Sequence, residues 1–279
     1  MPHRRLFIAE IANGTVDSLD LTNGQRQRIK GLAEPQGIAY LPSLDQLVVA
    51  CGGDGTVRFY EARRLVPLGL IKLGEDADNV RITPGGQIAV GYGSGAIALI
   101  DAANRTIIRQ IALPVHPEGF QIDDAAQRLY VNLPNARSIA VVDLVAGSIV
   151  ARWRVPHRLN FPMAVVPQQG VIAIASRLPA YLTWFDATHG SILQDLPGCG
   201  DADDLFHDPK RQRWYMSCGS GKVTIFGKGG PTMTQIGSVS TASGARTSLF
   251  SPELDRLIVA APAGWLSANA KVLIFKPNN

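Results

Sequence analysis

The sequence lacks several features that would assign it to a functional class at once. No uninterrupted apolar run reaches the roughly 20 residues that a transmembrane helix needs, so no membrane span is expected. The N-terminal stretch MPHRRLFIAE has neither the apolar core nor the cleavage site of a signal peptide. The motifs H-x-x-x-H, G-x-S-x-G and C-x-x-C are also absent. Their absence removes support for zinc hydrolase, serine esterase and thioredoxin-type chemistry.

Charged residues are scarce as well, at 18% of the chain, and the net charge is only +4. The basic residues are scattered, and their densest groups are RQRIK (26–30), RWRVPHR (152–158) and KRQR (210–213). A mild and dispersed excess of this kind is typical of solvated outer strands and loops. Nucleic acid is therefore kept only as an alternative partner.

What the sequence does contain is a repeat. An apolar strand, a Pro or Asp, a short turn and a second apolar strand recur about every 42 residues, with starts near 35, 77, 117, 160, 202 and 245. Further alternating stretches such as 65–73 and 106–113 lie between these units, and helical periodicity is absent. Four short strands in each repeat are typical of a β-propeller blade. The aligned turn residues are Pro42, Pro84, Asp124, Pro167, Pro209 and Pro252.

The two ends of the chain complete this count. Residues 4–32 contain three strands that align with the second to fourth strands of a blade, and the last copy stops after its third strand at 271–276. The total is 26 strands, two fewer than seven blades of four require. We therefore predict an all-β, seven-bladed β-propeller of four-stranded antiparallel blades, forming one domain over 1–279. The ring would close where strands 4–32 meet the C-terminal blade, and the missing strands would leave an unpaired edge there.

The three cysteines follow the repeat. Cys51 and Cys218 end corresponding strands in different blades, too far apart to bridge. Cys199 lies just before the strand that pairs with the one ending at Cys218. A Cys199–Cys218 disulfide is therefore predicted if the protein is exported.

Acidic residues recur where the first strand of a blade begins, as in EDADNVRITP (75–84) and GDADDLFHDP (200–209). In a propeller these strand starts share one face at the mouth of the central channel, the top face, where ligand-binding loops are favoured. We therefore predict a small-molecule, cation or protein partner there. The predicted binding residues are Asp76, Asp78, Asn79, His116, Glu118, Asp201, Asp203, Asp204 and Arg246.

One interpretation of these acids is a metal site. Carboxylates gathered around a concave mouth are costly unless something neutralises them. A hard divalent cation, Ca²⁺ or Mg²⁺, would suit oxygen ligands from Asp78, Glu118 and Asp203. Arg246 could instead pair with one of the acids.

The other interpretation is turn chemistry. Asp before a strand often accepts a hydrogen bond from its own backbone two residues on, and this would make Asp76 and Asp201 turn formers. Asp78 and Asp203 would then bind amides of a neighbouring blade. His207 is predicted to be a packed, hydrogen-bonded core residue. Trp265, in the longest top-face loop (261–271), would either stack on a ligand or partner or pack against the neighbouring blade.

Several stretches resemble the YVTN-type β-propeller repeat proteins, and in particular the bacterial YncE-like group, over nearly the whole chain. They are EPQGIAY, GGDGTVRFY, DADNVR, HPEGFQID, NFPMAV, GDADDLFHD and GARTSLFSPELDRL. The resemblance implies a seven-bladed propeller that is exported to the periplasm or beyond, although this chain shows no export signal. Relatives also carry one more strand before the segment that matches RRLFIAE. The role of the group is mostly unestablished, and a few relatives are linked to DNA binding.

Three functions remain open. The favoured one is a monomeric, non-enzymatic binding or scaffold module whose ligand sits at the acidic top face and channel mouth. The second is a metal-dependent enzyme of lactonase or lyase type, with a carboxylate-bound ion as Lewis acid. The third is DNA binding through the basic outer strands. No catalytic residue is assigned.

Overall fold

The computed structural model describes residues 4–83, 85–230, 232–264 and 269–278, which form 26 β-strands in seven antiparallel sheets. The strands differ in how much of their surface is buried. β5 (Gln46–Cys51) is buried along its whole length, which explains its nearly continuous apolar sequence QLVVAC. β15 (Ser148–Arg154) alternates exposed and half-buried residues, as expected of a strand with one face exposed to solvent.

The first three sheets contain three, four and four strands, in the order of the chain. Their strands are β1 (Arg5–Glu10), β2 (Thr15–Asp20) and β3 (Arg26–Ile29); β4 (Pro35–Leu41), β5, β6 (Thr56–Glu61) and β7 (Pro67–Lys72); and β8 (Val80–Ile82), β9 (Ile88–Tyr92), β10 (Ala96–Asp101) and β11 (Thr106–Ala112).

Three further sheets have four strands each and the last has three. Their strands are β12 (Phe120–Asp123), β13 (Arg128–Leu133), β14 (Ser138–Asp143) and β15; β16 (Arg158–Val166), β17 (Val171–Leu178), β18 (Ala180–Asp186) and β19 (Ile192–Pro197); β20 (Ala202–Asp208), β21 (Arg213–Cys218), β22 (Lys222–Lys228) and β23 (Met233–Ser240); and β24 (Ser248–Ser251), β25 (Arg256–Ala261) and β26 (Lys271–Phe275). Short 3₁₀ turns occupy Ile11–Asn13, Pro134–Ala136 and Pro167–Gln169.

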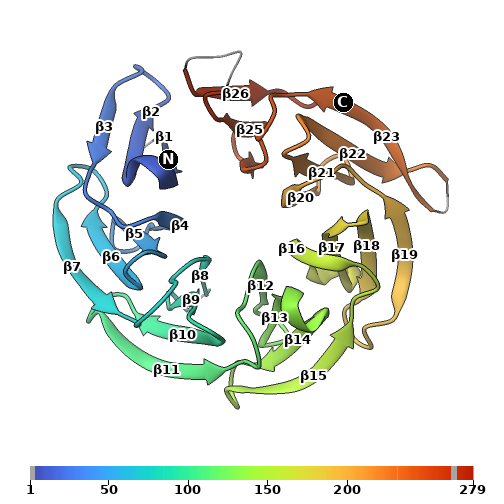
Figure 1. Cartoon of the computed structure of the whole chain (residues 1–279), viewed down its shortest axis with the longest axis horizontal. Helices are drawn as coiled ribbons and strands as arrows, with labels where there is room; N and C mark the ends of the chain where they lie inside the picture. The colour runs from blue at the N-terminus through green and yellow to red at the C-terminus, as the bar shows by residue number, and fades with distance from the viewer. Residues whose placement is uncertain (1–3, 84, 231, 265–268, 279) are drawn as a thin grey trace. The chain divides into compact units, whose positions relative to one another are not determined.

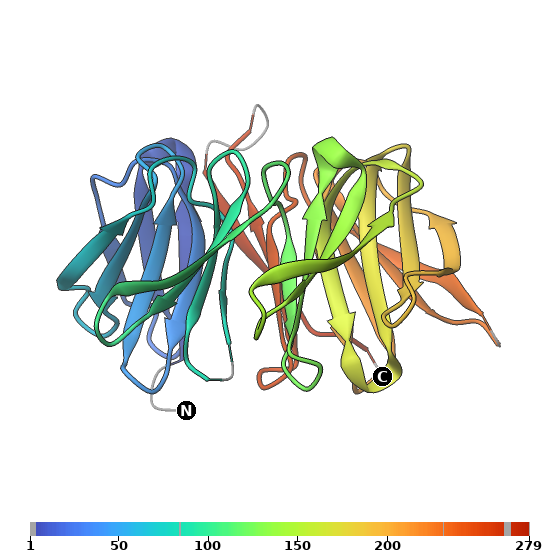
Figure 2. The same cartoon turned by 90° about the horizontal axis from the view of Figure 1, so that it is seen from below.

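The chain is an all-β seven-bladed β-propeller with mostly four-stranded antiparallel blades, and its first and last blades have three strands each. Figure 1 shows each blade as a group of successive strands, and Figure 2 shows the same strands lengthwise. The predicted fold class is confirmed, including the number of strands and the two blades that lack one. Of the predicted turn residues, Pro84 lies outside the described residues.

The chain divides into two compact units. The first consists of Met1–Glu118, Ala126–Leu129 and Val142–Val150, and the second of Gly119–Ala125, Tyr130–Val141 and Ala151–Asn279.

The hydrophobic core of each unit lies between successive sheets. In the first unit, Phe59 and Val57 of one sheet pack with Ile88 and Ile100 of the next. In the second unit, Trp184 packs edge-on against Trp214 of the following sheet, at 6.1 Å between ring centroids. Full burial of a side chain such as Phe59 stabilises the fold by about 1.5–3 kcal/mol. Because one sheet cannot cover both of its own faces, each depends on its neighbours for this core.

Cys199 and Cys218 form a disulfide, with Cα atoms 5.9 Å apart, and Cys51 is a free, buried thiol. The antiparallel register explains the bond, because Cys218 lies opposite Ala202, only a few residues beyond Cys199. The predicted pairing is confirmed.

A buried ionic network follows β20. Arg211, whose side chain is 5% exposed, contacts Asp208 Oδ2 at 2.9 Å and Asp255 Oδ1 at 2.6 Å. The hydroxyl of Tyr215 also donates to Asp208 Oδ2, at 2.8 Å. Arg211 Nε donates to the carbonyl of Asn278 at 3.0 Å, so the network also holds the C-terminal residues against this sheet.

Among the described residues, no helix is both long enough and apolar enough to cross a membrane.

Candidate functional site

The backbone at the start of the first strands has a common conformation. Five residues at or just before the start of a first strand have a positive φ: Glu34 (52°), Asp76 (41°), Leu159 (59°), Asp201 (60°) and Gly244 (78°). The carbonyls of Glu34, Asp76 and Asp201 accept hydrogen bonds from the amides of Gly52, Gly93 and Gly219, at 2.9, 3.2 and 2.8 Å. Asp is among the residues that tolerate this left-handed conformation best. The recurring acid therefore has a structural role in the turn.

The details of that turn differ from the prediction. We expected the Asp76 side chain to accept a hydrogen bond from the amide two residues on. Instead the amide of Asp78 donates to the carbonyl of Gly91, at 2.9 Å. The left-handed backbone brings the Asp76 carbonyl to the glycine turn, so the turn is closed by main-chain bonds and the Asp76 carboxylate stays half-exposed.

In the second unit, two aspartates and two arginines form one ionic network, here called the charged network: Arg177, Asp201, Asp203 and Arg246. Arg246 Nη1 lies 3.1 and 2.9 Å from the two carboxylate oxygens of Asp201. Its Nε lies 3.4 Å from Asp203 Oδ2. Arg177 contacts the Asp203 carboxylate directly and lies 3.3 Å from Asp201 Oδ1. Two positive and two negative charges thus balance.

Arg177 is the member that the sequence did not reveal. It lies near the end of β17, its Nε donates to the carbonyl of Ala202 at 2.8 Å, and its guanidinium lies 4.0 Å from the ring centroid of Phe161. The signal available was weak, namely a single Arg at the end of the apolar run VIAIASR. Second strands end on the same edge where first strands begin, because the two are antiparallel. That rule could have placed Arg177 next to the acids.

The four side chains of the charged network differ in their burial and in their pKa shifts. Burial raises the pKa of the Asp203 carboxyl, although Arg177 and Arg246 act in the opposite direction. The hydrogen bond to Asp201 raises the pKa of the Arg246 guanidinium. The side chains of Asp201 and Arg246 are 40% and 44% exposed, against 32% for Asp203 and 18% for Arg177. The network therefore has an inner pair, Arg177–Asp203, and an outer pair, Asp201–Arg246.

Asp204 has a different role. Its Oδ2 accepts a hydrogen bond of 2.6 Å from the amide of Ser248, in the following sheet. The sequence had suggested Asp203 for such a contact with a neighbouring blade. Asp203 instead faces the arginines, and the next residue joins the two blades.

The predicted residues of the first unit form smaller contacts. His116 Nδ1 lies 2.6 Å from the carbonyl oxygen of Gly93 and 3.6 Å from Asp76 Oδ2. Because a carbonyl only accepts, Nδ1 carries a proton in this contact. Asn79 Nδ2 donates to Asp78 Oδ2, at 3.1 Å. Glu118 lies half-buried in the loop before β12.

A common site for all of these residues stays a prediction, as does the proposed metal site of Asp78, Glu118 and Asp203. Over the part of the chain that the structure describes, no group of three or more His, Cys, Asp or Glu side chains is placed to hold a metal ion. Trp265 lies outside the described residues.

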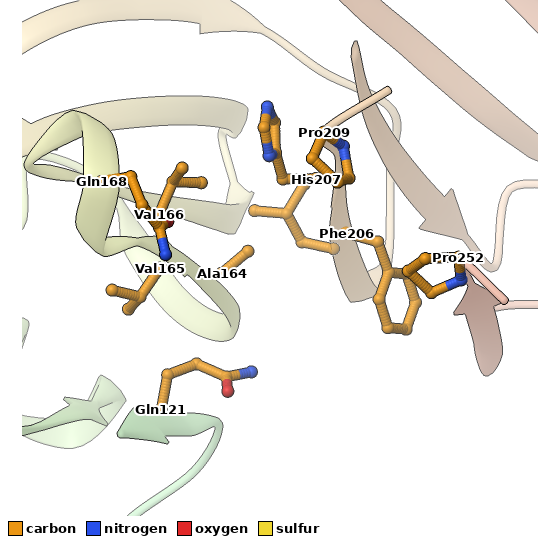
Figure 3. A pocket seen from close by; sticks show the side chains of 10 residues that line it. Gln121, Ala164, Val165, Val166, Gln168, Phe206, His207, Pro209 and Pro252 are labelled. Atoms are coloured by element: carbon orange, nitrogen blue, oxygen red, sulfur yellow. The ribbon is translucent and has the colours of Figure 1, made fainter. Parts of the chain in front are cut away.

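A cavity of about 330 Å³ lies at the other end of the same first strands in the second unit. Figure 3 shows its side chains, which come from β12, β16 and β20 and from the turns after β16, β20 and β24. The lining residues are Gln121, Ala164, Val165, Val166, Gln168, Leu205, Phe206, His207, Pro209 and Pro252.

His207 differs in part from its prediction. Its ring packs against Trp214 with centroids 4.7 Å apart, as expected of a packed residue. No described residue forms a hydrogen bond with the imidazole, however, and the side chain lines the cavity. The prediction that His207 is packed is therefore confirmed, and the prediction that it is hydrogen-bonded within the core is wrong. His207 is only half-buried, as is Phe206 beside it, whereas Leu205 and Asp208 on either side of these two residues are buried.

Comparison with known proteins places the fold. No protein-family model and no curated protein matches the sequence. Among solved structures, the chain is similar to hydrazine synthase of Kuenenia stuttgartiensis (TM-score 0.84, 19% identity, 98% of this chain and 92% of that chain). It is similar to a chain of the mitotic checkpoint complex (TM-score 0.85, 14% identity, 99% and 87%).

A third similar structure is a functionally unknown protein of Desulfotomaculum acetoxidans DSM 771 (TM-score 0.74, 12% identity, 98% of this chain and 99% of that chain). At these identities the similarity establishes a WD40-like, seven-bladed propeller fold and nothing further.

Proposed function

We propose that this chain is a monomeric, non-enzymatic binding module of the YncE-like β-propeller group, which holds a small zwitterionic molecule or a peptide terminus at the charged network. The observation that carries the proposal is the outer pair, Asp201 and Arg246. Both side chains are about two-fifths exposed, and the main chain of each is hydrogen-bonded, Asp201 to Gly219 and Arg246 to Gly244. A pre-organised pair of opposite charges at a strand start suits a ligand that carries both charges.

The chemistry of the ligand follows from the division into inner and outer pairs. A ligand carboxylate would bind the Arg246 guanidinium, and a ligand ammonium would bind the Asp201 carboxylate. The inner contact of Arg177 with Asp203 would stay in place and hold the site rigid. A divalent cation fits less well, because it would have to displace guanidinium groups from both carboxylates.

Export to the periplasm or beyond forms part of the same proposal. The Cys199–Cys218 bond supports it, because structural disulfides persist mainly in oxidising compartments. Fractionation of the native host, followed by mapping of the two cysteines without reduction, would test it. A protein recovered from the cytoplasm with both thiols free would contradict it.

The binding proposal is tested by calorimetry with glycylglycine as zwitterion and N-acetylglycinamide as its neutral counterpart. Glycylglycine is expected to bind and to raise the melting temperature, whereas the neutral compound does neither. Arg246→Gln and Asp201→Asn are each expected to abolish the effect. Lys228→Gln, an exposed lysine at the far end of β22, serves as the matched control and should bind as the wild type does.

Two results would overturn this proposal. One is equal binding of glycylglycine to the wild type and to Arg246→Gln. The other is a rise in melting temperature with Ca²⁺ alone, reversed by EDTA, while glycylglycine has no effect. The second result would instead support the metal site.

A further inference from the structure

We propose that the cavity lined by Ala164, Leu205 and His207 is a second binding site, which takes a small, uncharged, largely apolar molecule with a planar hydrogen-bonding group directed at His207. It lies at the opposite end of the first strands from the charged network, and it does not depend on the function proposed above.

The cavity has buried apolar residues on its inner side and exposed turn residues at its edge. Ala164 and Leu205 are buried, at 7% and 3% exposure, and form apolar lining. Gln168, Pro209 and Pro252 are exposed and lie in turns. The volume of about 330 Å³ is at the lower end of the range for small-molecule sites. A compact ligand of one or two rings suits these dimensions.

The lining carries no formal charge. Its polar side chains are Gln121, Gln168 and His207. Burial lowers the pKa of the His207 imidazole below its usual value, so the ring is neutral at pH 7. The neighbouring Asp208 carboxylate is bound by Arg211 and Tyr215. A charged ligand would lose its hydration here without gaining an opposite charge, which favours an uncharged one.

Hydrogen-bonding capacity remains inside the cavity. The neutral imidazole of His207 offers one donor and one acceptor, neither of which bonds to a described residue, and Trp214 packs against the ring. In the view of Figure 3, Gln121 and His207 lie on opposite sides of the space between the strands. Gln121 Nε2 donates to the carbonyl of Met163 at 3.1 Å, which holds its carboxamide in position. A planar amide has the matching donor and acceptor.

The test uses three isosteric probes that differ in charge: benzamide, benzoate and benzamidinium. Binding to the full chain is followed by NMR with ¹³C-labelled methyl groups. Benzamide at millimolar concentration is expected to give NOEs to the methyls of Ala164, Val166 and Leu205, and the two charged probes are expected not to. This measurement needs no variant and so does not depend on the folding of one.

A variant then tests the hydrogen bond. His207→Phe keeps an aromatic ring against Trp214 and removes both ring nitrogens, so benzamide affinity should fall about three- to tenfold, the usual effect of one lost hydrogen bond. His189→Phe, at an exposed histidine of the same unit, is the matched control and should leave the affinity unchanged. Absence of benzamide binding, equal binding of benzoate or benzamidinium, or NOEs to other methyl groups would each overturn the proposal.

Discussion

Gly219 lies directly against the carboxylate of Asp201. A methyl group built on Gly219 would overlap Asp201 Oδ2 and stand 2.8 Å from its Cγ. The amide of Gly219 also donates to the Asp201 carbonyl, at 2.8 Å. Because Gly219 has no side chain, the Asp201 carboxylate can occupy the space beside it and contact Arg246. The geometry of the charged network depends on a residue that carries no charge.

The first prediction concerns this close approach. Gly219→Ala should displace the Asp201 carboxylate and weaken its contact with Arg246, because the added methyl group would overlap Asp201 Oδ2. We expect a loss of about 1–3 kcal/mol in the free energy of unfolding, as for other overpacked sites, measured by urea denaturation.

Gly237 provides the matched control. It lies within β23, and a Cβ built there meets nothing within 4 Å. Gly237→Ala should therefore leave stability within about 0.5 kcal/mol of the wild type. If both variants lost the same stability, the effect would belong to glycine in strands and not to the contact with Asp201.

Most of the fold could be predicted from the sequence because a repeated unit shows its pattern several times. Pro42 and Pro209 mark the same turn in two copies, and alternating stretches fall between them. The strand at 271–276 was placed because it aligned with the third strand of other copies, and the structure has β26 at Lys271–Phe275. Periodic hydrophobicity and turn residues are local properties, which a single sequence contains.

The candidate site was less predictable because its contacts join different strands. The sequence placed Asp201, Asp203 and Arg246 at neighbouring strand starts, and the structure brings these three together. Arg177 was missed because its contacts join β17 to β20 of the following sheet, and the pattern of one strand does not show which side chains of the next sheet it meets. The cavity beside His207 could not be foreseen, since it depends on how side chains from three strands fill the space between them.

The second prediction concerns the disulfide. Cys199 and Cys218 are 19 residues apart in sequence, so closing this loop should stabilise the folded chain by about 3 kcal/mol. Dithiothreitol is expected to lower the melting temperature of the wild type and to leave that of the double variant Cys199→Ala/Cys218→Ala unchanged. The prediction would be contradicted if the melting temperature of the wild type stayed unchanged in dithiothreitol while mass mapping showed that the bond was reduced.

The third prediction separates the inner and outer arginines. Arg177→Gln leaves the partly buried Asp203 with one guanidinium partner, so it should cost about 1–3 kcal/mol at pH 7. Arg246→Gln removes a more exposed partner and should cost less than about 1 kcal/mol. Urea denaturation of both variants at pH 7 gives the comparison, and an equal loss in the two would contradict it.

The pH dependence of Arg177→Gln tests the same point. Burial already holds the pKa of Asp203 above its usual value, so its ionisation costs stability as pH rises through the folded-state pKa. Loss of Arg177 should raise that pKa further. The deficit of Arg177→Gln relative to the wild type should therefore be smaller near about pH 4 than at pH 7. The ¹³C shift of the Asp203 carboxyl reports the pKa directly.

The fourth prediction concerns acid unfolding. Hydrogen bonds from Arg211 hold the pKa of the Asp255 carboxyl well below its usual range. A depressed pKa contributes stability that is present above the unfolded-state value and is lost as pH falls toward the folded-state value. Asp255→Asn should therefore be less stable than the wild type at pH 7, and the gap should close as pH falls from about 5 to about 2.

The comparison with Asp255→Asn needs two precautions. Asp208 contacts the same guanidinium and also has a lowered pKa, so the wild type loses stability in acid for a second reason. Both proteins keep Asp208, so only the part of its effect that depends on Asp255 through their shared Arg211 enters the difference between them. Glu75→Gln, at an exposed carboxylate in the other unit, should follow the wild-type curve throughout. A gap between Asp255→Asn and the wild type that stays constant down to about pH 2 would mean that Asp255 contributes through packing and not through its charge.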